Sequence, residues 1–116
     1  MANLLVIDDD VDLAESLAGF LRRSGHAVTL AHDRQSAVEA YRAVRPDLVL
    51  LDLQLPDGTG FDVYSAIRDD DPVVVMITGH GDVPLAVQAM REGVENFLTK
   101  PVEMVHLAAT IDRSST

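Results

Sequence analysis

Runs of consecutive apolar residues, alternating with segments of helical spacing, constrain the fold of this chain most strongly. Residues 4–7, 48–51 and 73–77 contain no polar side chain. An unbroken apolar run is typical of a strand buried on both faces, because a half-exposed strand alternates apolar and polar residues. Residues 27–31 and 95–99 are shorter β-rich segments, which we interpret as two further strands. The pattern predicts a parallel sheet covered by helices on both faces.

The segments between these runs carry apolar residues three or four positions apart. Leu13, Leu17 and Leu21 lie on one face of a helix that follows a cap at Asp10 or Asp12 and ends at Gly25. Four more helices are expected: one capped by Asp33 and stopped by Pro46, one from Phe61 to the acidic residues 69–71, one capped by Asp82 and closed by Gly93, and one over residues 104–111, before a frayed tail from Arg113.

The order of strand and helix, repeated five times in 116 residues, indicates one α/β domain over residues 1–116. A doubly wound sheet of this size favours the flavodoxin-like strand order 2-1-3-4-5 with five helices. In that arrangement the order in which strands are added reverses between the first and third strands, while all strands stay parallel. Ligands of such sheets bind beyond the carboxyl ends of the strands at this reversal.

Composition excludes several classes of function. The net charge of −10 argues against direct binding of nucleic acid, which requires a basic face. The absence of cysteine excludes disulfides and thiolate chemistry. No apolar run approaches the roughly 18 residues of a membrane span, and no leader-like segment opens the chain, so we expect a cytoplasmic protein without membrane contact.

Polar residues follow the predicted strands where the crevice is expected. Asp8 and Asp9 end the first strand, Asp52 the third, Thr78 the fourth and Lys100 the fifth. Three carboxylates in one crevice repel one another unless a cation separates them, and all-oxygen ligation suits Mg²⁺. The alternative is structural, since aspartates also cap helices and turns, and Thr78 and Lys100 are ordinary residues for a strand end.

Other binding motifs are missing. No glycine-rich turn follows the first strand, so a dinucleotide site of the usual kind is not expected. The histidines are too scattered to form a metal set, and only His80 comes near the predicted crevice.

Four segments match a known family in order: VIDDD at the first strand, LLDLQLPDGTG at the third, MITGHGD at the fourth and FLTKP at the fifth. On these motifs the chain resembles the receiver domain of two-component response regulators, from about Leu4 to the last helix. The stretch ITGHGDVPLAVQAMREG is similar to receivers of enhancer-binding transcription activators, and to those of some helix-turn-helix regulators.

The resemblance implies a phosphoacceptor at Asp52, which would take a phosphoryl group from the phosphohistidine of a sensor histidine kinase. Asp9 would bind Mg²⁺ directly, Asp8 mainly through water, and Asp52 and the backbone carbonyl of Gln54 would complete the protein ligands. Such a domain catalyses only its own phosphorylation and dephosphorylation and is not an enzyme in the turnover sense.

The resemblance also implies a switch. Lys100 would pair with the phosphoryl oxygens, and Thr78 would donate a hydrogen bond to one of them. Phe97 stands where the family carries a switch aromatic, although a core strand residue explains its identity equally well. The face of the fourth helix, fifth strand and last helix would then change, promote a homodimer and control an output module, covalently linked or separate, that acts on transcription.

Two departures from the family pattern bear on the lifetime of the phosphoryl group: Gln54 stands where methionine is frequent, and His80 lies two positions after Thr78. Two rival functions remain open. One is a Mg²⁺-dependent phosphatase with an aspartyl nucleophile, although Gln54 stands where that class has its general acid. The other is a receiver-like interaction module that never accepts phosphate.

Overall fold

Five parallel strands form the centre of the molecule, which we describe from a computed structural model over residues 2–79 and 82–115. The sheet has the order β2-β1-β3-β6-β7. In chain order this is the arrangement 2-1-3-4-5, so the predicted flavodoxin-like topology is confirmed. The strands are β1 (Asn3–Ile7), β2 (Ala27–Ala31), β3 (Leu48–Asp52), β6 (Val74–Thr78) and β7 (Asn96–Thr99).

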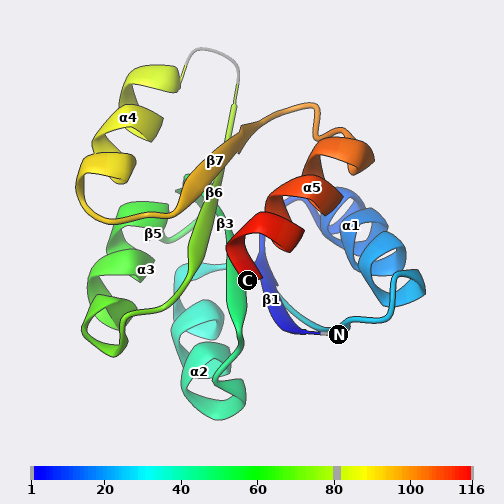
Figure 1. The fold of residues 1–116 in the computed structure, drawn as a ribbon. Coiled ribbons are helices and arrows are strands. Elements are labelled where there is room, and N and C mark those ends of the chain that lie inside the picture. Colours follow the sequence, from blue (N-terminus) through cyan, green and yellow to red (C-terminus); the bar gives the residue numbers. More distant parts are fainter. Residues whose placement is uncertain (1, 80–81, 116) are drawn as a thin grey trace.

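Helices cover both faces of this sheet (Figure 1). One face carries α1 (Val11–Arg23) and α5 (Met104–Ser115), and the other carries α2 (Arg34–Val44), α3 (Gly60–Ile67) and α4 (Val83–Arg91). Along β1, Leu4 and Val6 pack beneath α1 and α5, whereas Leu5 and Ile7 belong to the opposite core. Burial on both faces is the physical reason that the strand sequences do not alternate.

Two elements were not predicted, and one expectation was wrong. A two-stranded antiparallel ribbon, β4 (Gln54–Leu55) and β5 (Gly58–Thr59), follows β3, and a 3₁₀ turn, η1 (Arg68–Asp70), follows α3. The tail expected to fray from Arg113 instead continues α5 to Ser115. The helix thus continues past Ile111, its last buried residue among those described.

Helix starts follow the predicted caps at two positions. Asp10 accepts a hydrogen bond from the backbone N–H of Leu13, and Asp33 accepts one from that of Ser36. Each bond satisfies a backbone donor that the first turn of a helix leaves free. Asp82 stands at the start of α4, but its side chain makes no capping hydrogen bond.

The parallel register brings the carboxyl ends of the strands to one edge of the sheet. Ile7 pairs with Leu51, Asp52 with Ile77, and Thr78 with Thr99. The residues that follow these positions therefore meet beyond the same edge. Among the helices within the described ranges, none is both long enough and apolar enough to cross a membrane.

Candidate acidic site at the carboxyl edge of the sheet

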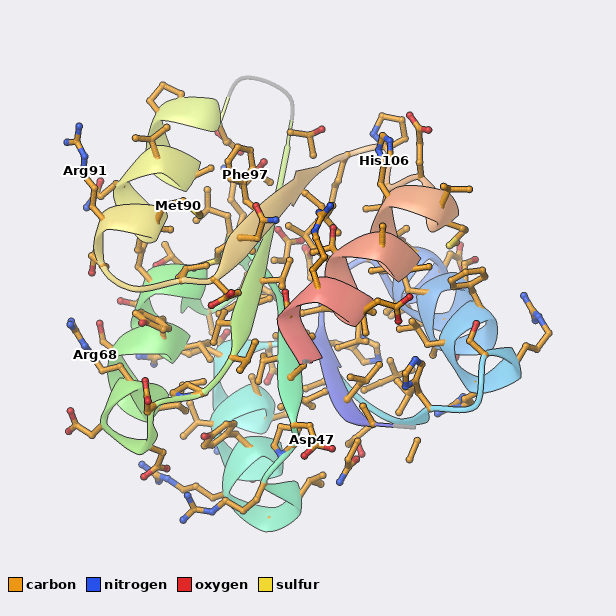
Figure 2. The ribbon with its side chains drawn as sticks, viewed as in Figure 1. Asp47, Arg68, Met90, Arg91, Phe97 and His106 are labelled. Carbon is orange, nitrogen blue, oxygen red and sulfur yellow. The ribbon has the colours of Figure 1, made fainter. Side chains whose placement is uncertain are left out.

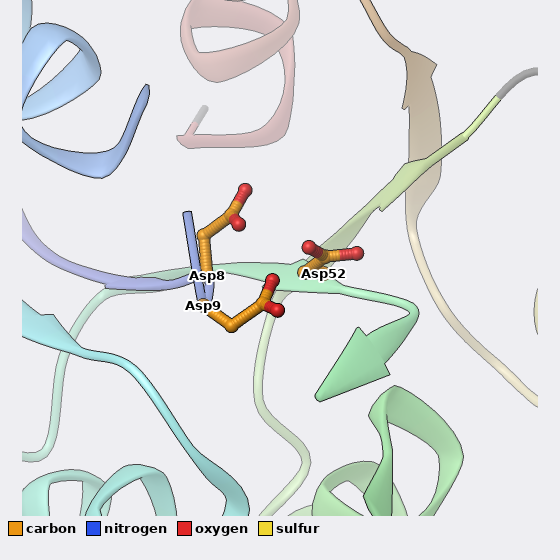
Figure 3. A group of neighbouring side chains, drawn as sticks. All are labelled: Asp8, Asp9 and Asp52. Atoms are coloured by element: carbon orange, nitrogen blue, oxygen red, sulfur yellow. The ribbon is translucent and has the colours of Figure 1, made fainter. Parts of the chain in front are cut away.

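Three aspartates converge beyond β1 and β3 (Figure 3). Asp8 and Asp9 follow the last residue of β1, and Asp52 is the last residue of β3. Each offers a carboxylate oxygen, and these oxygens all lie within 4.8 Å of one another. Asp8 and Asp52 are buried, with 0% and 4% of their surface exposed, while Asp9 faces solvent. The site thus combines two desolvated carboxylates with one accessible carboxylate.

Lys100 supplies the positive charge of this group. Its Nζ lies 3.0 Å from Asp52 Oδ2 and 3.4 Å from Asp8 Oδ2, and its backbone N–H donates to the carbonyl of Thr78. Burial alone would lower the pKa of Lys100, but the hydrogen bond and charge of Asp52 and the charge of Asp8 raise it above its ordinary value. Lys100 is therefore a cation at neutral pH and partly balances the two buried acids.

Asp8 is the least satisfied group of the site. Its Oδ1 accepts a hydrogen bond from the backbone N–H of Asp10 at 2.9 Å. Its buried Oδ2 has no hydrogen-bond partner among the described residues, and Lys100 approaches it only at ion-pair distance. Burial, together with the neighbouring Asp52, raises the pKa of Asp8 to about 6, although the hydrogen bond from Asp10 and the charge of Lys100 act in the opposite direction.

This donor set fits a divalent cation. A buried carboxylate oxygen without a hydrogen-bond partner is costly, and two more carboxylates beside it add repulsion. Oxygen ligands of this kind are those that Mg²⁺ prefers, with water completing its octahedral shell. The residues that could hold such an ion are Asp8, Asp9 and Asp52.

Gln54 borders the same space. Its backbone N–H donates to Asp52 Oδ1 at 3.1 Å, so the start of β4 is tied to the end of β3. A hollow of about 140 Å³ opens here, and its lining consists of Asp9, Asp52, Gln54, Gly79, Asp82 and Lys100. The hollow is small and polar, as a site for an ion and a small anion would be.

Two expected site residues lie apart from the hollow. Thr78 is fully buried at the end of β6, and its hydroxyl donates to the Leu98 carbonyl of β7 at 3.4 Å. Phe97 is half-buried on β7 and packs against the core on the side of α4, where Figure 2 shows it beside that helix. The structure therefore brings together Asp8, Asp9, Asp52, Gln54 and Lys100, whereas Thr78 and Phe97 belong to the neighbouring β6–β7 region.

Sequence reasoning missed two residues of the site. Asp82 is the N-cap residue of α4, as expected, but it also lines the hollow. His32 Nδ1 lies 2.9 Å from the backbone carbonyl of Asp8. The signal that could have found His32 is its position directly after β2, the strand beside β1. His80, which was expected near the crevice, lies outside the described residues.

Comparison with known proteins agrees with this geometry. The family model of the response regulator receiver domain matches residues 4–112. The DNA-binding response regulator MtrA of Mycobacterium tuberculosis is 39% identical over 109 residues, which are 93% of this chain and 48% of the relative. The regulatory protein LuxO of Vibrio cholerae is 35% identical over 94% of this chain and 24% of its own length. The chain thus spans half or less of these relatives.

Solved structures give the same result. A response regulator receiver domain protein from Clostridium thermocellum superposes with a TM-score of 0.94 at 28% identity, over 99% of this chain and 94% of that one. NtrX from Brucella abortus superposes with a TM-score of 0.93 at 36% identity, over 98% of this chain and 26% of that one. With the family model matching nearly the whole sequence, the chain belongs to the family of response regulator receiver domains.

Proposed function

We propose that this domain accepts a phosphoryl group on Asp52 from the phosphohistidine of a sensor histidine kinase. The observation that supports the proposal most directly is the environment of Asp52, whose carboxylate lies at the end of β3, beside the ammonium of Lys100 and close to the acids Asp8 and Asp9. Asp8, Asp9, Asp52 and the Gln54 backbone carbonyl would hold Mg²⁺. The ion would neutralise charge on the incoming phosphoryl group.

Asp52 acts as the nucleophile in this proposal. An oxygen of its carboxylate attacks the phosphorus, the bond between phosphorus and the donor nitrogen breaks, and the electron pair of that bond returns to the imidazole. Phosphoryl transfer depends chiefly on positioning and on charge neutralisation. Gln54 positions one carboxylate oxygen through its N–H, and Lys100 holds the other and stays beside the phosphoryl oxygens.

The acyl phosphate then acts as a signal. Thr78 would turn its hydroxyl from the Leu98 carbonyl toward a phosphoryl oxygen, and Phe97 would occupy the space that Thr78 vacates. A shift from 1:99 to 99:1 between two states requires about 5.5 kcal/mol. One charge-assisted hydrogen bond contributes less than that, so dimerisation on the face of α4, β7 and α5 would supply the remainder.

The output would be transcription, in the cytoplasm, through a module linked to the domain or separate from it. This part of the proposal is supported by relatives such as MtrA, which is named as a DNA-binding response regulator. The domain itself carries a net charge of −10, which disfavours direct contact with nucleic acid.

Intact-mass spectrometry after incubation with acetyl phosphate tests the proposal. We expect one phosphoryl adduct in the wild type with Mg²⁺, and none with EDTA or in Asp52→Asn. If no adduct forms, amide spectra with beryllofluoride test whether its lifetime is the reason. The absence of both the adduct and a spectral response would overturn the phosphoacceptor function, and turnover of a small phosphate ester would favour a phosphatase.

A further inference from the structure

The junction between β2 and α2, residues 31–35, contacts both loops that carry the proposed metal ligands. We infer that this β2–α2 junction fixes the position of the acidic loop after β1 relative to the β4–β5 ribbon, with His32 and Asp57 as positioning residues. The consequence for metal affinity rests on the proposed function, whereas the ordering of the two loops does not.

On one side, the junction holds both backbone groups of Asp8. The N–H of Asp8 donates to the Ala31 carbonyl at 3.0 Å, and the carbonyl of Asp8 lies 2.9 Å from His32 Nδ1. A carbonyl oxygen can only accept, so His32 Nδ1 is the donor. Both polar groups of the Asp8 backbone are thus held, and Asp8 is the residue whose side chain carries the buried, unsatisfied carboxylate oxygen. Asp9 follows directly.

On the other side, the junction holds the tip of the β4–β5 ribbon. The Asp57 carboxylate accepts hydrogen bonds from the backbone N–H groups of Arg34 at 2.6 Å and Gln35 at 3.1 Å. These are free donors of the first turn of α2, where the helix dipole also favours a carboxylate. Asp33 caps the next donor, at Ser36, so Asp57 completes the cap from a distant loop.

The anchor at the tip is transmitted to Gln54 through the ribbon. Gln54 pairs with Thr59 and Leu55 pairs with Gly58, so Asp57 lies at the turn that closes this short pairing. Gly58 packs closely under Arg34, because a Cβ at Gly58 would lie 2.9 Å from Arg34 Cδ. The ribbon is therefore fixed at its tip by α2 and at its base by the bond from Gln54 to Asp52.

Positioning matters here because the proposed ligands come from separate loops. Mg²⁺ requires near-ideal octahedral geometry, with ligands about 2.0–2.1 Å away, so it tolerates displacement of a ligand poorly. Groups that orient metal ligands typically change affinity 10–100-fold when they are removed. His32 and Asp57 act one step further out, through the backbone, so we expect about a 3- to 10-fold loss of Mg²⁺ affinity for each.

Matched variants separate positioning from stability. His32→Asn keeps an N–H donor near the position of Nδ1, whereas His32→Gln moves the donor one methylene further away. Asp57→Ala removes the anchor of the ribbon. Asp47→Ala is the control. Asp47 also accepts a hydrogen bond from a backbone N–H, that of Asn3 at 2.7 Å, and its replacement removes the same charge as Asp57→Ala does. Asp47 precedes β3, at the opposite edge of the sheet from the acidic site (Figure 2).

Two measurements are made on each variant: Mg²⁺ affinity by calorimetry, and amide hydrogen exchange of Asp10 and Gln54 without metal. We expect weaker Mg²⁺ binding in His32→Gln and Asp57→Ala, with His32→Asn and Asp47→Ala near the wild type. Exchange should accelerate at Asp10 in His32→Gln and at Gln54 in Asp57→Ala, because these amides report the order of the two loops.

The outcomes distinguish the two proposals. Variants that bind Mg²⁺ as the wild type does, with unchanged exchange, would overturn the inference and leave the proposed function intact. A wild type that binds no Mg²⁺ would contradict the metal part of the proposed function, and the exchange rates would then decide the inference alone. Equal losses in Asp47→Ala and Asp57→Ala would also overturn it, because they would indicate an effect of charge or stability.

Discussion

The ammonium of Lys100 lies 3.0 Å from the Asp52 carboxylate, although 48 positions separate the two residues in sequence. The same ammonium is 3.4 Å from Asp8, so without a metal Lys100 is the counter-ion of both buried acids. A divalent cation entering between the aspartates meets this positive charge. If the proposed function is right, Lys100 would therefore oppose the binding of the metal while it favours the binding of the phosphoryl group.

Replacing Lys100 by methionine should separate these two effects. We expect Mg²⁺ to bind more tightly, by about 30-fold, because the repulsion between a unit charge and a divalent ion about 4 Å apart is worth about 2 kcal/mol in a water-like medium. Formation of the phosphoryl adduct should become slower, because its oxygens lose a cation. Calorimetry measures the first effect, and intact mass over time the second. Unchanged or weaker Mg²⁺ binding would contradict this account of the ion pair.

Gly60 lies against the backbone at the end of β3, and it should not tolerate a side chain. A Cβ there would lie 2.6 Å from the Asp52 carbonyl oxygen and 3.1 Å from Leu53 Cα, and backbone atoms cannot move aside cheaply. We expect Gly60→Ala to lower the free energy of unfolding by about 2 kcal/mol, within the range for overpacking.

Gly19→Ala is the control for this change. Gly19 lies inside α1, and its Cβ would meet only the flexible end of Arg23, at 3.3 Å. Alanine is the better helix former, so we expect a gain of about 0.5–1 kcal/mol. Urea unfolding followed by circular dichroism measures both variants. A loss at Gly19 as large as that at Gly60 would mean that contact with the β3 backbone is not the cause.

Asp33 should make stability depend on pH in the acid range. The hydrogen bond from the Ser36 hydroxyl, followed by that from the Ser36 backbone N–H, holds the pKa of Asp33 below its ordinary value. A carboxyl with a lowered folded pKa stabilises the fold above the unfolded pKa of about 3.9, and the contribution is lost as pH falls through the folded value. The stability difference between wild type and Asp33→Asn should be constant above about pH 5 and change below about pH 4.

The pKa of Asp33, read from its carboxyl carbon by NMR, provides a direct check. In Ser36→Ala the largest cause of the lowered pKa is removed, so the value should rise toward the ordinary one. If the titration of Asp33 were the same in both proteins, the hydroxyl would not be responsible.

The sheet and the acidic cluster could be predicted from the sequence because both follow from local pattern and topology. An unbroken run such as residues 48–51 indicates a doubly buried strand, and the carboxyl ends of parallel strands meet at one edge. Asp8, Asp9, Asp52 and Lys100 were therefore expected together, and the structure brings them together. That they bind Mg²⁺ and phosphate stays a prediction.

Contacts between loops could not be predicted in the same way. Asp57 reads as an ordinary turn residue, but its carboxylate caps α2, whose first residue lies 23 positions earlier. Asp82 reads as a helix cap, but it also lines the acidic hollow. An aspartate in a loop can interact with its own turn or helix, or with a distant part of the fold, and tertiary packing decides between the two. The continuation of α5 to Ser115 was not predicted either, because residues 111–115 contain no glycine or proline that would mark the end of the helix.

Tyr64 and Gly93 should be energetically coupled. The Tyr64 hydroxyl donates to the Glu92 carbonyl at 3.2 Å, at the end of α4, and a Cβ at Gly93 would lie 2.8 Å from that hydroxyl. Gly93 also has a φ of +111°, which L-residues rarely adopt. Gly93→Ala therefore meets two penalties, backbone strain and a clash, and Tyr64→Phe removes the atom responsible for the clash.

A double-mutant cycle measures this coupling. Gly25→Ala gives the strain by itself, because Gly25 follows α1 with a φ of +97° and has nothing within 4 Å of its Cβ position. We expect about 1–2 kcal/mol for Gly25→Ala and a larger loss for Gly93→Ala. Tyr64→Phe should cost about 1 kcal/mol for its hydrogen bond. The double variant should be more stable than the sum of the single losses predicts, by about 1 kcal/mol. Additive losses would show that the Tyr64 hydroxyl can move aside, in which case the strain at Gly93 would account for its entire cost.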